Sequence, residues 1–199
     1  MNELEQIIIF IEKQYKLLNQ LWKKDKNYYS FNMQTSYVKD VYDNEALFNG
    51  ILFYRSFIRK CSNDFVIQVS KLPFTCSVST RIKTLNSIQF KIVNYIANHE
   101  NGKIPAKKCI NDILGIRVIL NDEEEYSSIL DFLKSSFPHL KIIFSHHGDY
   151  QAIHVYFGNE LNTNFQWELQ VWIKKYEEIN YESHSKYKQS YTKWEKENK

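Results

Sequence analysis

The chain has 199 residues, 43% hydrophobic and 16% aromatic, enough for one sizeable core and too few for several independent domains. Its net charge of +3 is too small to indicate a nucleic-acid binder by itself, although basic residues can still cluster locally. Cys61, Cys76 and Cys109 form no Cys-x-x-Cys pair and no apolar run reaches the roughly 18 residues of a membrane span, so composition excludes a disulfide framework, a zinc ribbon and a transmembrane protein. We therefore expect a soluble, cytoplasmic protein.

The first 70 residues are predicted to form a helical extension. Apolar residues recur at three- and four-residue steps over residues 3–24 and again over 43–60, the spacing of amphipathic helices. Lys23 and Lys24, followed by Tyr28, Tyr29 and Phe31, suit contact with a phosphate backbone and its bases. The same residues equally suit a lysine-rich helix end followed by a loop, so both interpretations stay open.

Residues 71–199 are predicted to form a domain in which strands alternate with helices. We expect strands over 74–80, 107–120, 140–145, 150–157 and 165–173, the last two joined as a hairpin through Gly158 and Asn159. Helices are expected over 84–98 and from the Asn121-Asp122 cap to Leu133, and residues 174–199 favour a C-terminal helix. This order predicts an α+β fold: one central mixed five-stranded sheet flanked by helices, with the N-terminal extension at 1–70.

Four polar residues at the first strand and its following helix predict a phosphate-binding site. Arg81 and Lys83 alternate as on a strand edge, and Ser87 and Lys91 are four apart, which places them on one helix face. A strand that turns into a helix here would direct all four at one point, near a helix N-terminus that itself favours anions. The competing interpretation is an ordinary solvated helix face.

Two acids interrupt apolar strand sequence. Asp112 and Arg117 are expected on one strand, and Glu168 and Gln170 on another. Buried charges need partners or a metal, and two carboxylates from neighbouring strands suit Mg²⁺, whose other ligands are water and phosphate oxygens. With the phosphate-binding residues nearby, this combination indicates metal-assisted phosphoryl or pyrophosphoryl transfer, and the alternative is an internal ion-pair network.

Histidines cluster near the fourth strand. His146, His147, Asp149 and His154 invite a zinc site, but the alternation of the strand does not bring them together as tetrahedral ligands. Tyr150 and His154 suit a stacking ring and a hydrogen-bonding group for a base or sugar, or two satisfied core residues.

Five motifs then follow one another along about residues 72–190. They are Arg81-x-Lys83-x-x-x-Ser87-x-x-x-Lys91, Asn111-Asp112-Ile-Leu-Gly115-Ile-Arg117, Tyr150-x-Ala152-x-His154, Glu168-Leu-Gln170-Val and His184-x-x-Tyr187-Lys188. In order and spacing they resemble the synthetase domain of the RelA/SpoT alarmone synthetases. The chain has no room for the hydrolase and regulatory domains of the long members, so it looks like a small, synthetase-only member with a nucleotidyltransferase-like fold.

The resemblance implies an ATP-dependent pyrophosphokinase, in which Mg·ATP donates its β,γ-pyrophosphate to a ribose 3′-hydroxyl and AMP leaves. Residues matching Arg81 and Arg117 would sandwich the adenine, and those matching Lys83, Ser87 and Lys91 would hold the phosphates. Asp112 and Glu168 would bind Mg²⁺, and Glu168 would also orient or deprotonate the attacking hydroxyl. On the acceptor side, Tyr150 would stack on the base, with His154 and Gln170 in the same pocket.

Two departures concern the acceptor. Where alarmone-making members usually have Arg-Thr, this chain has Trp172-Ile173, and its ending resembles the toxic small alarmone synthetases of toxin–antitoxin pairs, several of which modify the 3′-CCA end of tRNA. A missing guanidinium weakens the case for an acceptor 5′-polyphosphate, which needs cationic neutralisation. We therefore expect a tRNA-directed toxin with a cognate antitoxin; the alternatives are a synthetase of (p)ppGpp or (p)ppApp and a silent nucleotide- or RNA-binding domain. The candidate tRNA contacts are Lys23, Lys24, Arg55, Arg59, Lys174 and Lys175.

Overall fold

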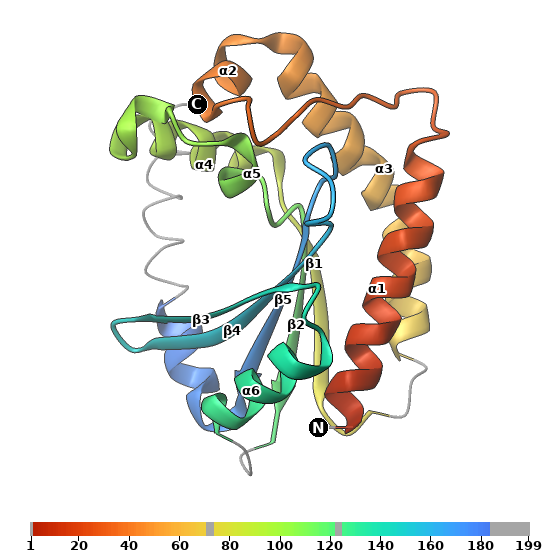
Figure 1. Ribbon diagram of the computed structural model, residues 1–199, viewed down its shortest axis with the longest axis vertical. Coiled ribbons are helices and arrows are strands. Elements are labelled where there is room, and N and C mark those ends of the chain that lie inside the picture. The colour runs from red at the N-terminus through yellow and green to blue at the C-terminus, as the bar shows by residue number, and fades with distance from the viewer. Residues whose placement is uncertain (1, 71–73, 122–124, 184–199) are drawn as a thin grey trace.

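A computed structural model describes residues 2–70, 74–121 and 125–183 (Figure 1). The helices are α1 (Asn2–Trp22), α2 (Val38–Asp43), α3 (Glu45–Ser70), α4 (Leu85–Asn98), α5 (Ala106–Cys109) and α6 (Tyr126–Ser136). The strands are β1 (Ser77–Ile82), β2 (Leu114–Leu120), β3 (Lys141–His147), β4 (Tyr150–Phe157) and β5 (Trp167–Ile173), with short 3-10 helices η1 (Glu100–Gly102) and η2 (Lys174–Tyr176). Residues 177–183 are helical. The predicted α+β fold is confirmed.

The five strands form one sheet in the order β1-β2-β5-β4-β3. β2 and β5 pair in parallel, and the other three pairings are antiparallel, so the sheet is mixed as expected. The predicted hairpin of the fourth and fifth strands is present as β4 and β5. β5 therefore lies at the centre, between β2 and β4, although it is the last of these strands along the chain.

One face of the sheet is apolar and is covered by α1 and α3, which lie side by side along it in Figure 1. The apolar stripe predicted for α1 is buried, including Leu4, Ile8 and Ile11. Two hydrogen bonds fix the helices to the sheet: the Tyr15 hydroxyl donates to the Phe165 carbonyl oxygen (3.1 Å), and Trp167 Nε1 donates to the Tyr54 hydroxyl (2.8 Å). Successive side chains of a strand point to opposite faces, so the polar side chains that alternate with these apolar ones lie on the opposite face of the sheet.

The strand predicted over 107–120 begins later, at Leu114, and this expectation was wrong for its first seven residues. Residues 106–109 form the short helix α5, because their backbone bonds elsewhere: the Ala106 and Lys107 amides donate to the carbonyl oxygens of Ser36 (2.8 Å) and Met33 (2.9 Å). Asp112 consequently precedes β2 and does not lie on it.

Other boundaries also moved. α3 continues ten residues past the predicted end at 60, and its half-buried Val69 packs against the core. The described part of α6 begins at Tyr126 with Glu125 as its N-cap, later than the predicted Asn121-Asp122 cap, of which Asp122 lies outside the described residues. His146 and His147, expected in a turn, are the last residues of β3.

The apolar core is continuous from α1 through the sheet to α6, and the division of the chain at residues 70 and 71 stays a prediction. None of the helices in the described ranges combines the length and the apolar composition that a membrane span requires.

Candidate active site

The polar face of the sheet carries five of the predicted site residues in two rows across the strands. Arg81 on β1 lies opposite Gly115 on β2, which lies opposite Glu168 on β5, and Glu168 lies opposite Tyr156 on β4. The next row, two residues along each strand, runs Ser79, Arg117, Gln170 and His154. Residues two apart on a strand share a face, so the sheet register alone brings these side chains together.

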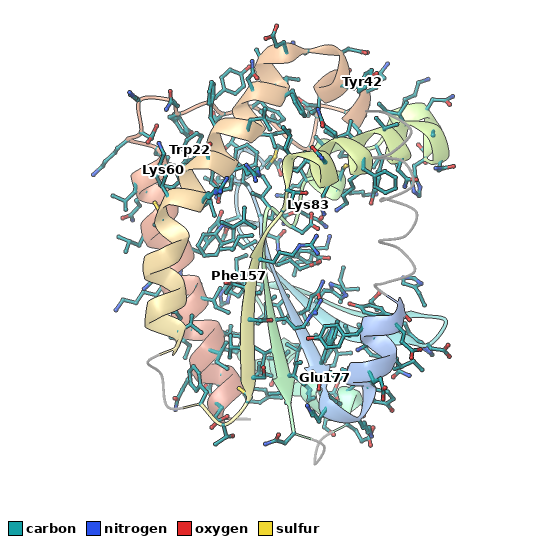
Figure 2. All side chains as sticks on the ribbon, turned by 180° about the vertical axis from the view of Figure 1, so that it is seen from behind. Trp22, Tyr42, Lys60, Lys83, Phe157 and Glu177 are labelled. Carbon is teal, nitrogen blue, oxygen red and sulfur yellow. The ribbon has the colours of Figure 1, made fainter. Side chains whose placement is uncertain are left out.

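Lys83 and Lys91 hold Asp112 between them. Lys83 Nζ forms an ion pair with Asp112 Oδ2, and Lys91 Nζ lies 3.1 Å from Asp112 Oδ1 and 3.0 Å from Asn111 Oδ1. Lys83 follows β1, Lys91 lies on α4 and Asp112 precedes β2, so three separate segments meet at one carboxylate. Lys83 is nearly buried in this arrangement (Figure 2).

Burial and the two lysines have opposite effects on the pKa of the Asp112 carboxyl group. Burial alone would raise the pKa of Asp112, but the charges of Lys91 and Lys83 outweigh it and hold that pKa well below the usual range. The pKa of Lys83 is lowered, first by burial and then by the charge of Lys91. Burial would lower the pKa of Lys91, but the acidic groups around it, Asp112 foremost, together outweigh burial and raise that pKa. One carboxylate thus neutralises one of two ammonium groups, and a positive charge is left for a ligand.

The N-terminus of α4 supplies hydroxyl and amide groups beside these lysines. Thr84 is the N-cap: its hydroxyl oxygen accepts from the Ser87 amide (3.2 Å), and the Thr84 hydroxyl donates to Ser87 Oγ (2.8 Å). Lys91 follows Ser87 by one helical turn. The strand-to-helix geometry predicted for the phosphate-binding residues is therefore present, with the exposed Arg81 on β1.

Glu168 accepts three hydrogen bonds from side chains on the polar face. His154 Nδ1 (2.9 Å) and the Tyr156 hydroxyl (3.0 Å) donate to its Oε1, and Gln170 Nε2 donates to its Oε2 (2.9 Å). Since a carboxylate only accepts, Nδ1 of His154 carries a proton, and its Nε2 lies 3.3 Å from the Tyr150 hydroxyl oxygen. Burial would raise the pKa of Glu168, but the hydrogen bond and the charge of His154, together with the bond from Gln170, outweigh burial and lower that pKa.

The Arg117 guanidinium lies over the Trp172 ring. Its guanidinium carbon is 3.6 Å from the centre of the Trp172 ring, and its Nη2 and Nε donate to Gln170 Oε1 at 3.0 and 3.3 Å. Trp172 itself is wholly buried. The residue that departs from the alarmone-synthetase pattern therefore lies beneath an expected ATP-binding residue.

The candidate tRNA contacts do not form one patch. Arg55 on α3 is half-buried and donates from Nε to the Lys83 carbonyl oxygen at 2.7 Å, so it braces the turn between β1 and α4. Lys174 and Lys175 are exposed and form ion pairs with Glu177 and Glu125. Figure 2 shows Trp22, the neighbour of Lys23, and Glu177 at opposite ends of the molecule. Lys23, Lys24 and Arg59 are exposed at the Trp22 end.

The sequence of the chain matches that of a known protein family. Residues 80–192 match the region found in RelA / SpoT proteins, which is more than half of the chain and includes every site residue described above from Arg81 onward. The chain belongs to the RelA/SpoT family. As a member it is an ATP-using pyrophosphokinase, a transferase. The fifth motif, with His184, Tyr187 and Lys188, falls inside this match and outside the described residues.

Two solved structures of this family from Bacillus subtilis are similar to the chain at low identity. Small alarmone synthetase 1 is 16% identical with a TM-score of 0.43, over 74% of this chain and 82% of that one. Small alarmone synthetase 2 is 20% identical with the same TM-score, over 73% of this chain and 82% of that one. No curated protein sequence matches the chain.

RelA/SpoT synthetases typically use Mg²⁺, and the residues present fit that ion. Within the described ranges, no cluster of three or more His, Cys, Asp or Glu side chains could hold a metal. The candidate protein ligands for the ion are therefore the two carboxylates Asp112 and Glu168. They are close enough that the charge of Asp112 raises the pKa of Glu168. Two carboxylates completed by water and phosphate oxygens are the usual donor set of Mg²⁺.

Sequence reasoning missed three residues of this RelA/SpoT site. Tyr156 is two residues after His154, so the same alternation that indicated Tyr150 and His154 would have found it. Thr84 directly precedes a helical pattern, which is the sequence signal of an N-cap. Gly115 interrupts an apolar strand, and the nearest atom that a Cβ there would meet is the Arg81 carbonyl oxygen at 3.7 Å. A glycine inside a strand often marks close approach of a ligand.

Proposed function

We propose that this RelA/SpoT synthetase transfers the β,γ-pyrophosphate of ATP to the ribose 3′-hydroxyl at the 3′-CCA end of tRNA. The observation that supports it is the uneven charge of the polar face. Arg81, Lys83, Lys91 and Arg117 gather at β1, β2 and α4. The β4 and β5 half, which we call the neutral half because these strands carry no Lys or Arg, presents Tyr150, His154, Tyr156 and Gln170 beside Glu168. A nucleotide acceptor with a 5′-polyphosphate needs cations where it binds, and a tRNA terminal adenosine does not.

The cationic half suits ATP. Arg81 and Arg117 extend from neighbouring strands on one face and would enclose the adenine, while Lys83, Lys91 and the Ser87 hydroxyl would hold the phosphates. Four cations and the two carboxylates Asp112 and Glu168 leave a net charge of +2, which favours a polyanion. Mg²⁺ bound by those carboxylates would neutralise charge on the transferred group.

The neutral half suits a ribose and its base. Glu168 lies between the two halves with its carboxylate fixed by His154, Tyr156 and Gln170, so it can accept a hydrogen bond from the 3′-hydroxyl and orient it towards the β-phosphorus. The hydroxyl oxygen forms the new bond to the β-phosphorus and its proton passes to Glu168, while the bond between the β-phosphorus and the oxygen shared with the α-phosphate breaks and AMP leaves. Tyr150 would stack on the terminal base.

A basic path connects the site to the Trp22 end of the molecule and suits the tRNA backbone. Arg55 contacts the Lys83 carbonyl, Arg59 follows one turn later on α3, and the Trp22 ring lies 5.4 Å from that of Phe57 on the same helix. Lys23 and Lys24 extend this path beyond α1. Lys174 and Lys175 lie at the far end, and the proposal no longer includes them.

The same chemistry with a guanine or adenine nucleotide as acceptor is the second candidate. One observation favours it: exposed Lys141 on β3 lies opposite Tyr156, with its ammonium 5.3 Å from the ring centre. That ammonium would serve an acceptor 5′-phosphate. A tRNA-modifying activity would block aminoacylation and stop translation, and a cognate antitoxin would restrain it, whereas a (p)ppGpp or (p)ppApp synthetase needs no such partner.

The deciding experiment offers γ-labelled ATP together with bulk tRNA, GDP, GTP or ADP and follows which acceptor becomes labelled. We expect labelled tRNA. Reversing charge at Lys23 and Lys24 to glutamate should reduce tRNA labelling and the salt dependence of tRNA binding, because phosphate contacts are lost. The matched control is the same double reversal at Lys174 and Lys175, which should change neither.

The two candidates also separate at Lys141. Lys141→Ala should leave tRNA labelling intact, whereas it should weaken labelling of GDP or GTP if these are the acceptors. Efficient labelling of GDP without labelling of tRNA would refute the tRNA proposal and establish the second candidate.

A further inference from the structure

Arg117 is held on one side by an aromatic ring that the RelA/SpoT pattern does not anticipate. The 3.6 Å separation from the Trp172 ring centre is direct cation–π contact, well inside the range of about 6 Å in which such attraction acts. Because Trp172 is wholly buried, the ring cannot turn to solvent and presents a fixed surface. Gln170 Oε1 accepts two N–H groups of the same guanidinium and fixes its rotation.

The second aromatic ring near Arg117 does not cover its other face. Tyr181 lies 5.3 Å from the guanidinium carbon and 5.1 Å from the Trp172 ring, against which it packs edge-on. A ring on the opposite face of the guanidinium would stand much farther from Trp172. Tyr181 therefore lies beside Trp172, and within the described ranges no aromatic ring that contacts Arg117 covers the guanidinium face that points away from Trp172.

We infer that Trp172 is a positioning residue for the donor nucleotide: it holds the Arg117 guanidinium flat so that its outer face stacks on the adenine of ATP. This inference rests on the proposed donor role of Arg117 and assigns the Trp172 departure to the donor side. Where alarmone-making members usually have an arginine, this chain has Trp172, whose ring supports the guanidinium of Arg117. Planar stacking is what distinguishes Arg from Lys at such a site, so the orientation of the guanidinium matters and its charge alone does not suffice.

The competing explanation is that Trp172 only fills the small apolar cluster with Ile119 and Ala152. Two substitutions separate the two. Trp172→Phe keeps an aromatic face, and Trp172→Met keeps apolar bulk without one. Both are made in the full chain, and circular dichroism checks the fold before binding is measured.

The measurement is the dissociation constant for a non-hydrolysable ATP analogue and, separately, for inorganic tripolyphosphate, which has no base. Trp172→Met should weaken the analogue about threefold to thirtyfold, the range of one cation–π contact, and leave tripolyphosphate unchanged. Trp172→Phe should stay close to the wild type. In an Arg117→Ala background, Trp172→Met should have no further effect, because the two residues act as one unit.

Several results would overturn the inference. They are unchanged analogue binding in Trp172→Met, equal weakening of both ligands, equal weakening by Met and Phe, or a full effect of Trp172→Met without Arg117. Trp167 provides the packing control, because it is equally buried on β5 but faces the other side of the sheet; Trp167→Phe should leave analogue binding unchanged. If Arg117→Ala itself leaves analogue binding unchanged, the donor assignment under the proposed function fails as well, which distinguishes the two failures.

Discussion

Asp112 faces two ammonium groups, so removing its charge should affect the fold as well as the reaction. Asp112→Asn should abolish pyrophosphate transfer and lower the free energy of unfolding by on the order of 3 kcal/mol, because Lys83 and Lys91 would then repel each other with little water to screen them. Urea unfolding and the label-transfer assay measure the two effects.

A second substitution separates these effects. Lys83→Met removes one ammonium, so adding it to Asp112→Asn should recover most of the lost stability while transfer stays abolished. Were the single variant as stable as the wild type, Asp112 would not be balancing the two lysines.

Tyr156 tests the hydrogen bonding of Glu168 by the loss of one oxygen atom. Tyr156→Phe removes one of the two donors to Oε1, and we expect a loss of about 1.5–3 kcal/mol in stability, as for a hydrogen bond to a charged group. Turnover should fall while the KM for ATP is unchanged, since the ring and the cationic half remain. Steady-state kinetics at saturating acceptor check this, and an unchanged kcat would mean that His154 and Gln170 suffice to hold the carboxylate.

At the scale of the strand, Gly115 should separate stability from activity. Alanine suits a strand better than glycine by about 0.5–1 kcal/mol, and its methyl group would meet only ordinary contacts, so Gly115→Ala should unfold at equal or higher denaturant concentration. The same methyl would stand on the polar face between Arg81 and Glu168, where we propose that the substrate binds. We therefore expect weaker binding of the ATP analogue.

Gly115→Val places a larger side chain at the same position and should weaken binding of the ATP analogue further than Gly115→Ala does. Full analogue affinity in both variants would show that the substrate does not approach β2 at this point.

The spacing of residues along the sequence predicted those elements whose residues interact mainly with residues close to them in the chain. The alternation of Arg81 and Lys83 and the four-residue step from Ser87 to Lys91 identified β1 and α4, because these spacings are properties of single elements. Pattern could not predict α5, since its position depends on backbone bonds to Met33 and Ser36, some seventy residues earlier. The stack of Arg117 on Trp172 also escaped prediction, because it depends on the register of β2 against β5.

At the scale of the whole molecule, the buried thiol of Cys109 gives stability a dependence on alkaline pH. Burial raises the pKa of Cys109 from about 9 to about 11, so between these values the unfolded chain loses a proton that the folded chain keeps. The contribution is fully present below pH 9 and declines up to pH 11, by at most about 1.4 kcal/mol per pH unit. The difference in unfolding free energy between the wild type and Cys109→Ala, measured at several pH values, isolates it. A difference that stays constant from pH 8 to 11 would contradict a protonated thiol in the folded state.

The central place of β5 has a consequence for synthesis on the ribosome. Before β5 emerges, β1–β2 and β3–β4 are two separate antiparallel pairs with no edge in common, and two-stranded pairs are marginal by themselves. The cationic half and the neutral half of the polar face then have no fixed relation, and Glu168 is not yet in place. Nascent chains that stop short of β5 should therefore be catalytically inert, and the enzyme can act only once nearly the whole described fold has been translated.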